Sequence, residues 1–234
     1  MIPSVDVASL PVVTEAQMRE VDRVMIEDLR IDLIQMMENA GRDLAQLTSE
    51  LWDPGCVVVL AGPGGNGGGG LVAARHLANH GVSVSVVLAS EPSRLAPVPA
   101  HQLDIVGRME IPVLRQPSPE TDVVLDAVIG YSLRGDPTGR AAELIAWANE
   151  GDPPILALDT PSGLDVTTGA VATPCTRATA TLTLAAPKRG LLRSPEVVGD
   201  LYVGDISVPP GVYRDLGFGE AMLFEDQPIV RALT

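Results

Sequence analysis

Residues 57–77 read VVVLAGPGGNGGGGLVAARHL, and this stretch decides the fold. Four apolar residues open it, a run that is almost all glycine follows, and apolar residues then recur at helical spacing. The pattern predicts a strand over 56–61, a glycine loop over 62–70 and a helix over 70–80. Glycine has no Cβ, so a bound group can come within contact distance of the backbone. The unpaired N–H groups of the helix N-terminus therefore favour a phosphate at this turn.

The glycine run matches no specific nucleotide-binding motif completely. No Lys-Ser or Lys-Thr pair follows the glycines, so the run is not a P-loop. A dinucleotide-binding dehydrogenase carries an acidic residue at the end of its second strand, whereas here the acid, Glu91, comes late. Taken alone, the run predicts a nucleotide site and a merely flexible connection equally well.

The composition is that of a globular protein with a substantial core. The chain has 234 residues, of which 46% are hydrophobic and 20% charged, and its net charge is −14. This charge argues against nucleic acid and anionic membrane as partners, since both require basic patches. No apolar run has membrane-spanning length, and the first residues lack the features of a signal peptide, so we expect a cytoplasmic protein. Cys56 and Cys175 suggest no disulfide framework or zinc site, and we expect both to be small buried hydrophobes.

The remaining pattern predicts alternating strands and helices behind a helical N-terminus. Thr14 and Gln17 form a capping box, which predicts the start of the first helix. We expect helices over 14–28, 31–51, 100–109 and 139–149, and further strands over 82–89, 111–114, 122–129, 155–159, 178–184 and 200–208. The segments around Tyr213 and Leu223 stay unassigned. The order predicts one α/β domain over residues 1–234, a three-layer αβα sandwich with a mostly parallel central sheet and an N-terminal helical extension.

Three loops at the carboxyl ends of predicted strands should converge on one crevice, because ligands of open α/β sheets bind there. These loops are 62–70, 129–136 and 158–165. Asp159 closes an apolar strand, so it is a candidate general acid–base; capping of the following turn is an equal alternative. Asp165 lies in GLDVTTG, where bonding of turn amides is the commoner role.

Other polar residues suggest a cation site and a phosphate contact. Asp126 is a charge inside an apolar strand, so a cation or a hydrogen-bond network should accompany it. Together with Asn66 and Ser162 it supplies hard oxygen donors that suit an oxygen-loving cation. Lys188 follows another strand and either contacts phosphate or is a solvated loop lysine. His76, His80 and His101 fall on predicted helices without a partner pattern, and we expect them at the surface.

Several motifs together resemble the NAD(P)H-hydrate epimerase family, also called YjeF N-terminal domains. MREVDRVMIEDLRIDLIQMMENAGR resembles the N-terminal helices of that family, and the glycine run with GLVAARHL resembles its phosphate loop. LDAVIG, ALDTPSGLDVTTG and APKRGL match later signatures in order and spacing. The resemblance covers residues from about 18 to about 208.

The resemblance implies a Rossmann-like fold, usually in a homodimer, and a repair reaction. That reaction is epimerisation at C6 of hydrated NADH or NADPH (NADHX and NADPHX), and a separate dehydratase acts on the S form. It implies potassium at Asn66, Asp126 and Ser162, and catalysis by Asp159 with help from Lys188. The positions it implies for substrate binding are Gly65, Asn66, Gly67, Gly68, Gly69, Gly130, Tyr131, Ser132, Leu133, Arg134, Gly135, Asp136 and Asp159.

The glycine run departs from the family pattern at two positions. The family loop reads Asn-Asn-Gly-Gly-Asp-Gly, whereas Gly65 and Gly69 here replace the first Asn and the Asp. Each lost hydrogen bond to substrate costs on the order of 1–3 kcal/mol. A degenerate nucleotide-binding or scaffold protein of the same fold is therefore the alternative function, and a nicotinamide dehydrogenase ranks well below both. We also expect the fused dehydratase of many relatives to be missing.

Overall fold

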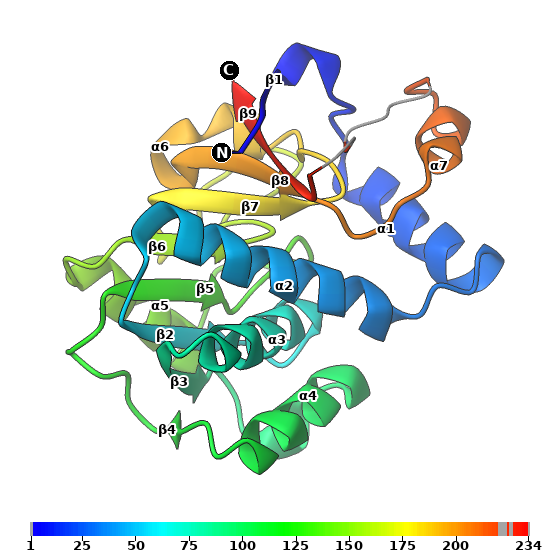
Figure 1. Cartoon of the computed structure of the whole chain (residues 1–234). Helices are drawn as coiled ribbons and strands as arrows, with labels where there is room; N and C mark the ends of the chain where they lie inside the picture. Colours follow the sequence, from blue (N-terminus) through cyan, green and yellow to red (C-terminus); the bar gives the residue numbers. More distant parts are fainter. Residues whose placement is uncertain (1, 220–223, 225–226, 234) are drawn as a thin grey trace.

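A nine-stranded sheet runs through the described part of the computed structural model, which comprises residues 2–219, 224 and 227–233. The strand order is β1-β9-β8-β7-β6-β5-β2-β3-β4, and every pairing is parallel except that of β8 with β9. In Figure 1, α2 and α3 lie in front of the sheet and α5 behind it. The predicted three-layer α/β architecture with a mostly parallel sheet is confirmed.

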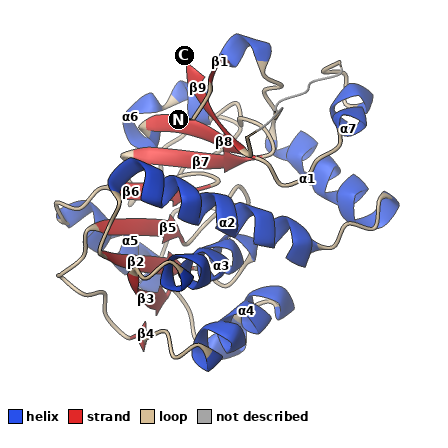
Figure 2. Ribbon diagram, viewed as in Figure 1, coloured by secondary structure: helices blue, strands red, loops and turns tan. Residues whose placement is uncertain are grey.

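The strands are β1 (Ser4–Asp6), β2 (Cys56–Ala61), β3 (Ser83–Leu88), β4 (Val113–Leu114), β5 (Val123–Ala127), β6 (Ile155–Leu158), β7 (Ala180–Leu184), β8 (Asp200–Gly204) and β9 (Ile229–Leu233). The helices are α1 (Glu15–Arg23), α2 (Leu33–Trp52), α3 (Gly65–Asn79), α4 (Pro97–Arg108), α5 (Gly139–Glu150), α6 (Pro195–Val198) and α7 (Pro210–Asp215). A π-helical turn covers Val24–Asp28, and short 3-10 turns cover Val7–Ser9, Pro92–Arg94 and Leu191–Arg193. Figure 2 shows these elements by type. Among the described residues no helix is long and apolar enough to cross a membrane.

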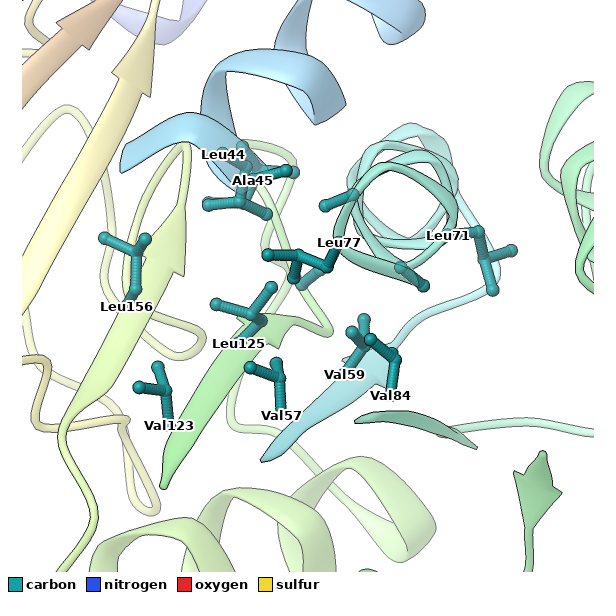
Figure 3. Close-up of a cluster of buried hydrophobic side chains, with 14 of the residues drawn as sticks. Leu44, Ala45, Val57, Val59, Leu71, Leu77, Val84, Val123, Leu125 and Leu156 are labelled. Carbon is teal, nitrogen blue, oxygen red and sulfur yellow. The ribbon is translucent and has the colours of Figure 1, made fainter. Parts of the chain in front are cut away.

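Alternating residues of β2 bury the two faces of the sheet. Val57 and Val59 pack with Leu44 of α2 and Leu77 of α3, as Figure 3 shows. Val58 and Leu60 belong instead to the cluster that α5 covers. Because both sets of side chains are buried, the strand reads as a continuous apolar run rather than an alternating one.

The glycine run is helical, which corrects the predicted loop over 62–70. α3 begins at Gly65 with Gly64 as its N-cap, so the turn between β2 and α3 is only Gly62, Pro63 and Gly64. The helix therefore starts at the first glycine after the turn and not at residue 70. The Gly68 N–H bonds the Gly64 carbonyl oxygen, so the N–H groups without an intrahelical partner lie at the start of the run, which includes Gly65 and Asn66.

Close packing explains why a poor helix former is used here. A Cβ at Gly67 would lie 1.9 Å from the carbonyl oxygen of Gly62, and a Cβ at Gly70 would lie 2.6 Å from the Cβ of Ala127. From the facing helix, a Cβ at Gly41 of α2 would lie 2.4 Å from the Cβ of Val72 on α3, so the two helices pack closely at this glycine. Tertiary contact thus overrides the low helix propensity of glycine.

Two strands lie outside the predicted set. The prediction placed the last strand at 200–208, but β8 ends at Gly204 and β9 pairs with it antiparallel. The N-terminal β1 then pairs with β9 in parallel. β1 is a three-residue strand at the edge of the sheet, and so short a segment leaves little pattern in the sequence. Of the unassigned segments, Tyr213 lies in α7, and Leu223 lies outside the described residues.

The N-terminal helical extension forms one wall of a cavity at the carboxyl ends of the parallel strands. The predicted capping box is confirmed, since the Thr14 hydroxyl and the Gln17 side chain bond each other's backbone N–H. α1 passes into the π-helical turn, so the predicted helix over 14–28 is only partly α-helical. In Figure 1, α1 lies beyond the tip of β7, at the carboxyl ends of the parallel strands.

Candidate functional site

A cavity of about 580 Å³ lies at the carboxyl ends of β5 and β6, between α1, α2 and the N-terminus of α3. Its walls are mainly apolar, with a few polar groups that include two carboxyl groups. The lining residues are Met18, Arg19, Asp22, Ile26, Leu33, Met36, Met37, Ala40, Pro63, Gly64, Gly65, Asn66, Gly69, Val128, Ile129, Gly130, Tyr131, Ser132, Leu158, Asp159, Leu184 and Ile206. Apolar pockets with a few convergent polar groups are typical ligand sites.

The cavity brings together part of the predicted substrate-binding set. Gly65, Asn66, Gly69, Gly130, Tyr131, Ser132 and Asp159 line it. Leu133, Arg134, Gly135 and Asp136 do not, and neither do Gly67 and Gly68. Those two glycines are buried inside α3, where a Cβ at Gly68 would meet the Met37 sulfur. Arg134 instead pairs with Glu15, and Asp136 accepts a hydrogen bond from the backbone N–H of Thr173 at 3.2 Å.

Asp159 and Lys188 form a buried ion pair at the edge of the cavity. Asp159 is 3% and Lys188 1% exposed, and Lys188 Nζ bonds Asp159 Oδ1. Nζ also donates to Thr183 Oγ1 at 3.1 Å and to the carbonyl oxygen of Leu184 at 2.8 Å. Lys188 is therefore not a solvated loop lysine, and it does not line the cavity. It compensates the charge of Asp159, which faces the cavity.

The alternative of a turn cap at Asp159 is not what the structure shows. Its carboxylate accepts from Lys188 and, at 3.3 Å, from the backbone N–H of Leu184, the last residue of the neighbouring strand β7. It therefore bonds a neighbouring strand end rather than the amides of its own turn. The Asp159 backbone has φ 67°, a left-handed conformation that is uncommon for residues other than glycine.

Asp126 and Ser162 form the hydrogen-bond network that the sequence offered as one alternative. Asp126 Oδ2 accepts from the backbone N–H of Ser162 at 2.8 Å, and Oδ1 accepts from its hydroxyl at 2.7 Å. The same hydroxyl oxygen accepts from the backbone N–H of Ile129 at 2.8 Å. Burial raises the pKa of Asp126, and the bonds from Ser162 oppose that shift. The network ends β5 at Ala127, earlier than predicted, because side chains take over the backbone N–H groups.

The donor set suits a potassium-like cation. The Asn66 side chain packs against Gly130, next to the Ile129 amide that Ser162 binds. Its Nδ2 is buried and has no hydrogen-bond partner among the described residues. Amide, carboxylate and hydroxyl oxygens are hard donors. The unpaired Nδ2 is a hydrogen-bond donor, so what it lacks is an acceptor; only the Oδ1 atom of Asn66 could serve as a cation ligand.

Asp22 is a cavity residue outside the predicted site, and it contacts Tyr131. Asp22 lies on α1 and lines the cavity, and Oδ2 accepts a hydrogen bond from the Tyr131 hydroxyl. The Arg19 guanidinium lies 5.6 Å from the centre of the Tyr131 ring. The signal was the helical spacing of Arg19, Asp22 and Ile26, which places three lining residues on one face of the helix.

Other expectations concern residues away from the cavity. Asp165 Oδ1 accepts from the backbone N–H groups of Thr167 and Thr168, so its structural role in a turn is confirmed. Cys175 is buried, and burial raises the pKa of its thiol to about 12, whereas Cys56 is only half-buried, which corrects the expectation for that residue. His76 bonds Glu38 at 2.8 Å.

Comparisons with known proteins identify the family. The family model described as "YjeF-related protein N-terminus" matches residues 33–190. A protein of Dehalogenimonas lykanthroporepellens named "NAD(P)H-hydrate epimerase" is 47% identical over 212 residues, which cover 88% of this chain and 85% of the relative. Another with that name, from Truepera radiovictrix, is 37% identical over 86% of this chain and 92% of the relative.

Longer relatives and a solved structure agree with this match. A "Bifunctional NAD(P)H-hydrate repair enzyme Nnr" of Hyperthermus butylicus is 41% identical over 83% of this chain, which covers only 38% of that relative. The crystal structure of the yeast protein ynu0 superposes with a TM-score of 0.84 at 26% identity, covering 95% of this chain and all of that one. With the fold, the cavity and these matches together, the chain belongs to the family of YjeF-related protein N-termini.

Proposed function

We propose that this protein is an NAD(P)H-hydrate epimerase, which interconverts the R and S forms of NADHX and NADPHX at C6. The observation that carries the proposal is Asp159, a charged acid–base group compensated by Lys188 and facing a mainly apolar cavity. The N-terminus of α3 opens into the same cavity at Gly65 and Asn66 and offers backbone N–H groups to a phosphate. Relatives named for this activity support the assignment.

Epimerisation requires the hydroxyl to leave C6 and to return on the other face of the ring. The C6–O bond breaks as the lone pair of the ring nitrogen forms a double bond to C6, and water then adds to that carbon. A carboxylate beside C6 can remove the proton from the incoming water, and general acid–base groups typically contribute about 10²–10⁴-fold. Asp159 takes this role, and Lys188 holds its carboxylate in place through their ion pair.

A potassium ion held by Asn66, Asp126 and Ser162 would supply positive charge beside the α3 N-terminus. These residues provide only oxygen ligands, which is the preference of such a cation. Potassium chloride should therefore raise the melting temperature more than tetramethylammonium chloride at equal ionic strength, because only a bound ion stabilises the fold by mass action. Asn66→Ala should abolish the difference. An equal effect of both salts would argue against the site.

The proposal extends to the oligomeric state, the cellular location and the partner enzyme of the protein. The protein acts as one domain over residues 1–234, forms a homodimer, works in the cytoplasm and supplies a separate dehydratase with the S form. Bifunctional relatives named as repair enzymes support the link to a dehydratase. Sedimentation of the purified protein tests the dimer directly.

The decisive experiment couples the purified protein to a dehydratase that accepts only the S form. R-NADHX is supplied as substrate, and formation of NADH is followed. We expect the protein to accelerate repair well above the spontaneous rate of epimerisation. A rate equal to the spontaneous one would exclude the catalytic function.

The alternative, a binding protein without turnover, rests on Gly65 and Gly69. The variant Gly65→Asn with Gly69→Asp restores the family loop and separates the two functions. A Cβ at Gly65 would meet nothing within 4 Å, whereas a Cβ at Gly69 would lie 2.7 Å from Leu158 Cδ2, the flexible end of a side chain. Leu158 must therefore turn aside. A large gain of activity over an inactive parent would indicate a decayed enzyme.

A further inference from the structure

Asp22 is a second carboxyl group in the cavity, and it comes from a different element than Asp159. Asp22 lies on α1, whereas Asp159 follows β6. Both line the cavity, and the charges of Asp159 and Lys188 both act on the Asp22 carboxyl group. The two acids therefore lie within electrostatic reach of each other, in a space of about 580 Å³ that can hold a ring.

Neighbouring side chains hold Asp22 by one oxygen and leave the other available. Tyr131 donates its hydroxyl to Oδ2, while no described residue donates to Oδ1. The Tyr131 ring lies under the Arg19 guanidinium, and Arg19 is fixed by Glu15 at 2.7 Å. Because the carboxyl group is anchored on one side only, Oδ1 can bond a ligand in the cavity.

The two carboxyl groups differ in their electrostatic surroundings. Asp159 is compensated by the ammonium group of Lys188. Within the described part of the chain no cationic side chain bonds Asp22 directly, and burial raises the pKa of Asp22. The Tyr131 bond and the charges of Lys188 and Arg19 oppose this shift, while Asp159 adds to it. Burial and the neighbouring Asp22 also raise the pKa of Tyr131, so the phenol keeps its proton and remains a donor. Two acids whose surroundings differ in this way suit an acid and a base.

We propose that Asp22 is the second acid–base residue of this site, donating a proton to the hydroxyl that leaves C6 while Asp159 accepts one from the water that adds. The proposal rests on the epimerase function. It divides the reaction between an acid on α1 and a base at the end of β6. Tyr131 and Arg19 then act as positioning residues for the acid.

The step balances in atoms and charge. The C6–O bond breaks, its electron pair leaves with the oxygen, and the proton of Asp22 turns that hydroxyl into water. The lone pair of the ring nitrogen forms the N=C6 bond, and the ring becomes a cation between two carboxylates. Water adds to the other face, its proton passes to Asp159, and the electron pair returns to nitrogen. Solvent exchanges the protons of the two acids, so the net reaction is an isomerisation.

The first test replaces Asp22 by Asn, which can still accept the Tyr131 bond but carries no acidic proton. We expect kcat for R-NADHX epimerisation to fall about 10²-fold or more, with KM close to that of the parent. Glu20→Gln is the matched control, because Glu20 lies on the same helix and does not line the cavity. It should leave kcat unchanged.

The second test keeps the carboxyl group and changes its surroundings. Because Asp22 must be protonated to act, kcat should fall as pH rises through its pKa. Tyr131→Phe removes a hydrogen bond that lowers this pKa, so the basic limb should move to higher pH. In Asp22→Asn that limb should disappear.

The outcomes separate the inference from the function that it assumes. A parent without epimerase activity overturns both. An active parent whose kcat is unchanged by Asp22→Asn overturns only the role of Asp22. If Asp22→Asn does not fold, the shift of the basic limb in Tyr131→Phe decides, and an unshifted limb overturns the proposal.

Discussion

At the scale of single residues, the site depends on the buried carboxylate of Asp159, whose charge the ammonium group of Lys188 compensates. Asp159 and Lys188 are almost completely buried. Removing either side chain would leave the other one buried without its counter-charge. The left-handed backbone of Asp159 directs its carboxylate toward Lys188 and the Leu184 amide. The pair therefore links catalysis to stability, because the same contacts position the base and satisfy the buried ammonium group.

Asp159→Asn should lower both turnover and stability. The amide removes the base, so kcat should fall about 10²–10⁴-fold. It also leaves Lys188 buried without a counter-charge, which should cost about 3–5 kcal/mol of unfolding free energy in urea titrations. Adding Lys188→Met should restore much of the stability and none of the turnover. Recovery of turnover in the double variant would remove Asp159 from the mechanism.

At the scale of elements, α3 lies so close to the preceding turn and to β5 that only glycine fits at two of its positions. Gly67 and Gly70 are needed where the helix meets the preceding turn and β5, while Gly65 at its first position meets nothing. The helix N-terminus can therefore stand at the cavity, close behind β2. A bulkier helix would have to move away from the sheet, and its N–H groups would move with it.

Two alanine substitutions on α3 should act in opposite directions. Gly65→Ala should stabilise the protein by about 0.5–1 kcal/mol, because alanine loses less backbone entropy in a helix. Gly67→Ala should destabilise it by about 3 kcal/mol or more, since its Cβ would collide with the backbone at Gly62. Chemical denaturation of both variants checks this. Equal effects would show that the helix is less tightly packed than its backbone contacts indicate.

Asp43, which lies on α2 beside Gly204 of β8, should make the free energy of unfolding depend on pH. Asp43 is fully buried, neither of its oxygens has a hydrogen-bond partner among the described residues, and burial raises its pKa from 3.8 to about 7. The charge of Asp205 adds to the shift, whereas the charge of Arg42 and the nearby backbone N–H of Asp205, which lies outside ideal hydrogen-bond geometry, oppose it. The native state keeps this proton where the unfolded chain has lost it, so stability should fall as pH rises through that window.

The titration of Asp43 alone should remove about 4 kcal/mol between about pH 4 and about pH 8. Asp43→Asn should flatten this dependence of the unfolding free energy on pH. The variant should therefore be more stable than the parent at about pH 8 but not at about pH 4. Urea titrations at both values measure the difference. Asp104→Asn, which removes an exposed carboxylate on α4, serves as the control and should keep the parental slope.

At the scale of the whole molecule, the two ends of the chain complete one edge of the sheet. β9 lies between β8 and β1, as Figure 1 shows near the N and C labels. Ile229, Val230 and Ala232 are buried there, and the N–H of Arg231 bonds the carbonyl oxygen of Pro3 at 2.8 Å. β9 therefore covers β8, a strand that would otherwise expose a row of unpaired backbone groups.

Truncation after Gln227 should lower the urea midpoint and promote self-association, because it removes β9 and exposes the edge of β8. Deleting residues 1–6 removes only the outer strand and should have a smaller effect on both. Denaturation and light scattering of the two variants test the order. Equal midpoints would show that β9 adds nothing beyond its contact with β1.

The sequence by itself determined the α/β class, the order of the central elements and the convergence of Asn66, Gly130 and Asp159 at the carboxyl ends of the strands. These features follow from local patterns, since apolar runs and strand ends can be recognised within a few residues. Only the tertiary structure decided that the glycine run is helical, because distant backbone made that packing favourable. It also decided that Lys188 is buried against Asp159. The joining of Asp22 to Tyr131 and the pairing of β9 likewise depend on contacts between segments far apart in the chain, which no local pattern encodes.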